Sequence, residues 1–190
     1  MQKRIKIISV ILVVVILAVG AYMFYKSNKS YQSNESNGSN KTNQPNAANE
    51  TSQAPKPQGP LVYTHPEFGF TISAPDGFTA GSFPEGENGN ITLIQNSANK
   101  YGMQIFVRPF EEESVLTVAR IREEIPDMKI ENPIEVKVGE VPAVAFYTLS
   151  DSGQRTREIW FTRNKNLFQI SANAEYDNIT GSIMENWKWE

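Results

Sequence analysis

Residue types that could do chemistry are few in this chain of 190 residues. It has one histidine, His65, and no cysteine, which excludes thiol catalysis, disulfide scaffolds and lipid anchoring through cysteine. His65 and Glu67 stand two apart near the end of a predicted strand, so they face the same side, as two metal ligands would. Oxygen ligands would have to complete such a site. The other interpretation is an exposed histidine at a strand end.

Clustered carboxylates are the second candidates, because paired acids can act in general acid-base catalysis. All of them fall in predicted loops or at helix ends, where charge is simply solvated. No Gly-x-Ser-x-Gly nucleophile motif and no Gly-x-x-x-x-Gly-Lys phosphate loop occurs. We therefore predict no catalytic residue, no metal site and no cofactor, and keep as the alternative a hydrolase or metal-binding protein that uses His65 and carboxylates. The clusters are Glu85 with Glu87, Glu111 to Glu113, and Glu123 with Glu124.

Binding chemistry has two candidate groups. Three arginines lie on one side of a predicted strand and could contact an acidic polymer or lipid headgroups. The interpretation we favour is that they alternate with Glu158 on a solvated part of a sheet. Three tryptophans could stack on sugar rings, although core packing is the better interpretation. These residues are Arg155, Arg157 and Arg163, and Trp160, Trp187 and Trp189.

The chain divides into segments of different composition. Residues 1–60 carry seven Lys and Arg against two Asp and Glu, and residues 61–190 carry eleven against nineteen. The net charge of −3 therefore hides an acidic domain behind a basic start. Because acidic residues outnumber basic ones in the folded part, we expect no binding to nucleic acid.

Residues 7–25 form an apolar run after a basic start at residues 1–6, and Ser9 and Gly20 alone interrupt it. At about 1.5 Å per residue, a helix of this length matches the hydrocarbon core of a bilayer. The lysines and arginine before the run predict a cytoplasmic N-terminus and an extracytoplasmic remainder. Ala18-Val19-Gly20 also fits a signal cleavage site, in which case the protein is secreted, but the run is long for a signal core. We expect a retained anchor.

Residues 26–60 are polar. Ser and then Asn recur at every third position, and Pro55, Pro57 and Pro60 follow. Such a segment has too few apolar side chains to offset the entropy of ordering, so it is expected to be a disordered linker.

Residues 61–190 have globular composition and predict an α+β domain. Alternating patterns predict strands near 61–65, 68–73, 91–96, 101–107, 133–138, 141–150, 155–163 and 166–172. Short connections predict that the last four of these strands form an antiparallel meander. A loop is expected from Gly81 to Asn90. Helices are expected over 111–125, with the glutamates in the first turn, and from Asp177 as N-cap.

The strand at 141–150 is apolar on both faces: Val144 and Phe146 point one way, Ala143 and Ala145 the other. A sheet of about six or seven strands that is apolar on both sides needs cover on both sides. We therefore expect an antiparallel sheet between the helix at 111–125 and the C-terminal helix.

Several stretches resemble the PsbP-like domain family. Residues 63–78, with Gly-Phe-x-Ile followed by Pro-x-Gly-Phe, resemble the opening of those domains, and residues 183–189 resemble their ending, with Asn186 and Trp in place of the usual Ser and Phe. The resemblance implies an antiparallel sheet between helices. Members include the photosystem II extrinsic subunit and many membrane-anchored bacterial proteins, and a shared fold does not transfer a function.

These features together predict a membrane-tethered, extracytoplasmic and non-catalytic binding or accessory protein of bacterial type. Its anchor at 7–25 lies in the lipid bilayer, and its partner is expected to be an envelope protein or a surface polymer, met through the sheet or the acidic segment at 81–90.

Overall fold

The structure, a computed structural model, describes residues 59–112, 114–150 and 153–190. The expected anchor at 7–25 lies outside these residues, as does the expected linker up to residue 58. In the part of the chain that is described, no helix is both long and apolar enough to cross a membrane. The described residues belong to one unit, Lys56–Glu190.

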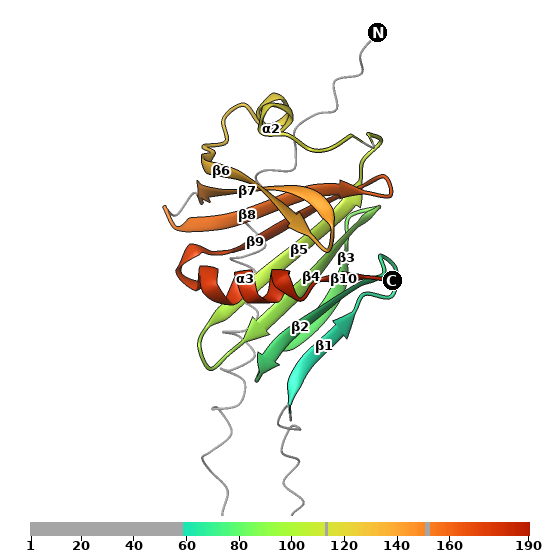
Figure 1. Cartoon of the computed structure of the whole chain (residues 1–190), viewed down its shortest axis with the longest axis vertical. Helices are drawn as coiled ribbons and strands as arrows, with labels where there is room; N and C mark the ends of the chain where they lie inside the picture. Colours follow the sequence, from blue (N-terminus) through green and yellow to red (C-terminus); the bar gives the residue numbers. More distant parts are fainter. Residues whose placement is uncertain (1–58, 113, 151–152) are drawn as a thin grey trace, which may run out of the picture. The chain divides into compact units, whose positions relative to one another are not determined.

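The domain is built on a seven-stranded sheet in which every neighbouring pair is antiparallel. Its order begins at the edge strand β3, and the last four strands in sequence form the expected meander (Figure 1). In spatial order the strands are β3 (Thr79–Glu85), β4 (Gly89–Asn96), β5 (Tyr101–Pro109), β9 (Asn166–Asn173), β8 (Arg155–Arg163), β7 (Val141–Leu149) and β6 (Glu131–Val138).

The expected loop at 81–90 is wrong, because those residues form β3, the turn after it and the start of β4. Gly81, Pro84 and the acidic residues have the composition of a loop. A strand at the edge of a sheet tolerates such residues, since only one side of its backbone is paired.

A second sheet, which the sequence did not predict, contains β1 (Pro60–Thr64), β2 (Phe70–Asp76) and β10 (Lys188–Trp189) in the order β1-β2-β10. β10 is only two residues long, and it pairs Trp189 with Phe70. The C-terminal residues therefore complete a sheet that begins at the other end of the domain.

The first described helix, α2 (Val118–Glu124), is shorter than the helix expected over 111–125. Thr117 has an extended backbone, and its side-chain oxygen accepts the N–H of Arg120, which defines the helix start. The carboxylate of Glu112 lies outside the helix and accepts hydrogen bonds from the Arg120 guanidinium. The short 3-10 helix η1 (Ala174–Tyr176) leads into α3 (Asp177–Glu185).

Both faces of the large sheet are covered, as expected. The α3 face carries Ala145, Ile159 and Phe161 and packs against α3 and the small sheet. The α2 face carries Val144, Phe146 and Trp160 and packs against Leu116 and Ile121. Figure 1 shows α3 crossing the large sheet and α2 near β6 and β7.

Candidate functional site

An open groove lies on the α2 face, between the segment that enters α2 and the strands β6 and β7. Residues 115–119, 133–137 and 142–144 line it, and it encloses about 650 Å³. One large apolar side chain stands open to solvent beside it, because Val115 is 61% exposed. We call this feature the β6 groove. Most of its lining is apolar, although Glu135 and Lys137 also line it, so it suits an apolar segment.

The wall of the β6 groove is held in place from both ends. Leu116 and Ile121 are buried against the sheet, and the Thr162 hydroxyl of β8 donates to the carbonyl of Ser114 at 2.8 Å. Arg120 contacts the carboxylates of Glu112 and Glu124. Because Leu116 and Ile121 point into the sheet, Val115 is left facing solvent.

His65 is not the exposed strand-end residue expected from the sequence, because it is 1% exposed. Its Nδ1 accepts the backbone N–H groups of Glu67 at 3.2 Å and Phe68 at 3.3 Å. Its Nε2 lies 3.0 Å from Ser82 Oγ and 3.1 Å from Asn90 Oδ1. Since Nδ1 accepts, Nε2 carries the proton and donates across the gap to β3 and β4.

With these hydrogen bonds His65 has no free ring nitrogen to bind a metal ion or to accept a proton from a substrate. Both ring nitrogens already have partners, and Glu67 meets the ring through its backbone N–H rather than through its carboxylate. No cluster of three or more His, Cys, Asp or Glu side chains within the described ranges could hold a metal ion. His65 therefore fixes the turn between β1 and β2 and ties it to the edge of the large sheet.

Glu158, expected on a solvated part of the sheet, is 7% exposed and lies on the α2 face. Its carboxylate accepts from Ser171 Oγ at 2.7 Å and from Trp160 Nε1 at 3.1 Å. Burial raises the pKa of Glu158, and the hydrogen bonds from Ser171, Trp160 and Thr156 partly oppose that rise. Local sequence does not reveal this burial, because the residues that cover Glu158 lie on other strands.

The three arginines lie on one side of β8, as predicted, and each contacts residues of the same chain. Arg155 Nε lies 3.4 Å from Glu131 Oε2, and the Arg155 guanidinium stacks over the ring of Tyr147. Arg157 Nε donates to Asp177 Oδ1 at 3.2 Å. The third, Arg163, stacks over a tryptophan ring near the C-terminus. With these contacts the arginines form part of the domain's own structure rather than a free cationic surface.

The sequence predicts Asp177 as the N-cap of the last helix, but in the structure Asp177 is the first residue of α3. Its carboxylate accepts hydrogen bonds from the Tyr147 hydroxyl and the Arg157 guanidinium, and these bonds join α3 to β7 and β8. The hydrogen bond to Asp177 raises the pKa of Tyr147, and burial adds to the rise.

The tryptophans pack in the core, in agreement with the favoured interpretation. Trp160 and Trp187 are buried, and Trp187 stacks on Phe70 with ring centroids 4.6 Å apart. Trp189 is half-buried and donates its Nε1 proton to the carbonyl of Val138.

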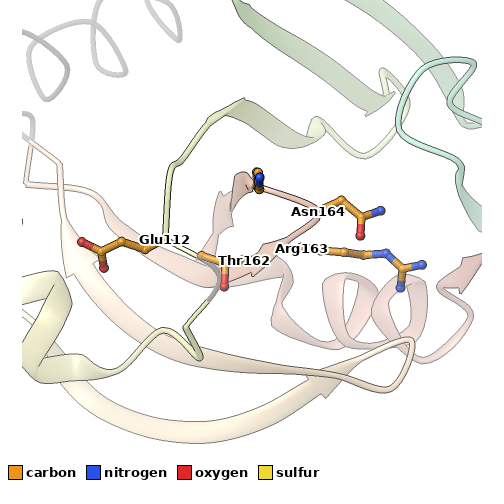
Figure 2. A pocket seen from close by; sticks show the side chains of 5 residues that line it. Glu112, Thr162, Arg163 and Asn164 are labelled. Atoms are coloured by element: carbon orange, nitrogen blue, oxygen red, sulfur yellow. The ribbon is translucent and has the colours of Figure 1, made fainter.

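A second, polar hollow of about 190 Å³ lies at the turn between β8 and β9. Its lining includes Glu112, Arg163 and Lys165. Figure 2 shows the side chains of Glu112 and Arg163 pointing away from one another. Groups that diverge in this way do not converge on one ligand atom, so the β6 groove is the better candidate site.

The other carboxylate clusters also stay apart from any shared site. Glu123 and Glu124 pair with Arg120 on the surface of α2, and Glu85 and Glu87 stand at the turn between β3 and β4. The residue missed by the sequence reasoning is Val115, whose exposure depends on where α2 begins.

The chain was compared with family models, curated proteins and solved structures. No family model and no curated protein matches the chain. Among solved structures, the chain is similar to the solution structure of cyanobacterial PsbP (CyanoP) from Synechocystis sp. PCC 6803, with 7% sequence identity and a TM-score of 0.49. The match covers 76% of this chain and 98% of that chain.

Proposed function

We propose that this protein is a non-catalytic binding or accessory protein, held at a membrane by residues 7–25, with its domain on the extracytoplasmic side. One observation favours binding over catalysis. The polar side chains that a catalyst would use, His65 and Glu158, are occupied in internal hydrogen bonds, whereas the larger of the two hollows is open and mostly apolar.

The partner that fits the β6 groove is a peptide segment of another envelope protein that presents apolar side chains. Val115 offers it exposed apolar surface, and burying such surface favours association. A surface polymer would need free cationic or stacking groups, but Arg155 and Arg157 already contact Glu131 and Asp177. No observation favours the alternative of a hydrolase or metal-binding protein that uses His65.

The binding proposal is tested with the full chain in lipid nanodiscs and a phage-displayed library of random peptides. We expect enrichment of peptides with several apolar residues, and loss of that enrichment when Val115→Glu places a charge beside the groove. Val62→Glu is the matched control, because Val62 is 67% exposed on β1, away from the groove. Equal retention by the Val115→Glu chain, or no enrichment by the unmodified chain, contradicts the proposal.

The anchor is tested separately by fractionating cells that express the full chain. We expect the intact chain in the membrane pellet after alkaline washing, because residues 7–25 match a bilayer in length and polarity. A chain that begins near Ala21 and is recovered from the medium would show that the segment is cleaved. That result would leave the binding proposal untouched.

A further inference from the structure

β6 is the last strand of the large sheet, and its free edge is accessible. The sheet order ends at β6, and residues 132–135 and 137 are exposed. No backbone hydrogen bond joins this edge to another element in the described part of the chain. A strand with an unpaired edge is a template for another strand.

The pairing with β7 determines which backbone groups point outward. Lys137 stands opposite Pro142, and because proline has no N–H, that pair cannot exchange two hydrogen bonds. Hydrogen-bonded and non-hydrogen-bonded pairs alternate along an antiparallel ladder. Glu135 opposite Val144 is therefore also a non-hydrogen-bonded pair. The N–H and C=O groups of Glu135 and Lys137 then point away from β7, toward the free edge.

We propose that a second copy of this chain pairs with that edge, β6 against β6, antiparallel about a two-fold axis at Val136. In this register Glu135 faces Lys137 of the other copy, and Lys137 faces its Glu135, so both outward-pointing residues meet an opposite charge. An axis at Glu135 would place two glutamates opposite each other, and an axis at Lys137 would place two lysines opposite each other. Like charges directly opposite are unfavourable, so charge selects the axis at Val136.

The side chains on the α3 face fit the same register. Val136 would meet Val136 of the second copy, and Ile134, which is 50% exposed, would meet Val138. Both Val136 and Val138 belong to the apolar cluster on that face. Pairing would therefore extend the apolar layer from one copy into the next and cover Ile134.

The charges of β6 are available for this exchange. In the described residues Glu135 has no ion-pair partner, and Lys137 pairs with Glu140, 3.3 Å away at an exposed turn. A lysine on an edge normally discourages strand pairing. Here Glu135 lies two residues away on the same face, so Lys137 discourages every partner except one with a matching carboxylate.

Disulfide cross-linking of the full chain tests the axis, because the chain has no cysteine of its own. Residues at the axis form a non-hydrogen-bonded pair with Cα atoms about 4.5 Å apart, within disulfide reach. We expect Val136→Cys to give a covalent dimer under mild oxidation. Ile134→Cys is the matched control: its two copies would lie four residues apart along the strand, about 14 Å, so we expect cross-linking at least about tenfold slower.

Charge reversal tests the pairing by sedimentation of the full chain in detergent, and every variant shares the same N-terminal segment. Glu135→Lys or Lys137→Glu alone creates like-charge pairs and should weaken the dimer at least about tenfold. The double variant restores opposite charges and should dimerise again. A mixture of the two single variants should form a heterodimer, because each then supplies the charge the other lacks.

The outcomes separate cleanly. A dimer that follows this charge pattern and cross-links at Val136 supports the proposal. Three results would overturn it: a chain that is monomeric at about 0.1 mM, a dimer that neither charge reversal weakens, or cross-linking that is as fast at position 134 as at position 136. Circular dichroism confirms folding of each variant, and all the changed charges lie on exposed positions. The pairing goes beyond the proposed binding function, which Val115→Glu tests independently.

Discussion

Replacing His65 separates two kinds of contact that this one side chain makes. Asn at position 65 places an oxygen where Nδ1 lies, so it can still accept the N–H groups of Glu67 and Phe68, as Asn does in local turns. It loses the Nε2 bridge and the ring contacts with Phe68 and Phe70, whose centroids lie 4.8 and 5.0 Å away. Ala loses all of these contacts.

The contacts give an expected size for each effect. Two aromatic contacts contribute about 0.5–1.5 kcal/mol each. Ser82 and Asn90 keep their hydrogen bond to each other, so the lost Nε2 bridge adds little, and we expect His65→Asn to lower the free energy of unfolding by about 2 kcal/mol. His65→Ala also leaves two part-buried N–H groups without acceptors, at about 1 kcal/mol each, the lower end of the usual range. The total loss for His65→Ala is then about 4 kcal/mol.

The assay is urea denaturation of the full chain in non-ionic detergent, followed by tryptophan fluorescence, since Trp187 lies in the same core as His65. Equal losses for the Asn and Ala variants would refute the role given to Nδ1. A loss below about 1 kcal/mol for Ala would refute the buried position of the ring. A hydrolytic activity abolished by His65→Asn at unchanged stability would restore the catalytic interpretation.

Two further substitutions test buried and close-packed positions. Because burial raises the pKa of Glu158 above its ordinary value of 4.5, the folded state binds the proton more tightly, and its stability falls as pH rises from below that value toward neutrality. Glu158→Gln removes this titration. The free energy of unfolding of the variant should therefore rise relative to that of the unmodified chain as the pH increases from below 4.5 toward neutrality. A difference between the two chains that does not change with pH would contradict the burial of the Glu158 carboxyl. Gly139 has φ +50°, and an added Cβ would come within 2.8 Å of the Trp189 ring. Gly139→Ala should lower the free energy of unfolding by about 2 kcal/mol or more. Gly86→Ala is the control and should lower it by about 1 kcal/mol, because Gly86 has φ +61° but open space around it. Thermal unfolding measures both losses, and equal losses would contradict the packing of Trp189.

Local patterns in the sequence predicted most of the large sheet. The double-sided apolar pattern of Val144 and Phe146 against Ala143 and Ala145 required cover on both faces, and the structure has it. The turns after β6 and β8 were marked by Gly139 and by Asn164 with Lys165, all of which have positive φ. Such signals are local, because they depend on side-chain alternation and on backbone conformation.

The errors occurred where distant residues decide the outcome. The sequence predicts a solvated Glu158 because it alternates with arginines along the strand, yet Ser171 and the α2 face surround it. His65 was interpreted as exposed because its partners, Ser82 and Asn90, lie on strands that the sequence suggested were a loop. The β6 groove depends on the start of α2 at Val118, which the glutamates before it obscured.

The two-residue strand β10 also determines when the domain can finish folding. Trp187 and Trp189 pack on Phe70, and the Glu190 N–H donates to the Gly69 carbonyl, so the core joins both ends of the domain. At about 5–20 residues per second, the ribosome needs roughly 6–24 s to pass from Phe70 to Trp189. Throughout that time Phe70 lacks the two tryptophans that complete its packing. Closure follows only when the last strand emerges.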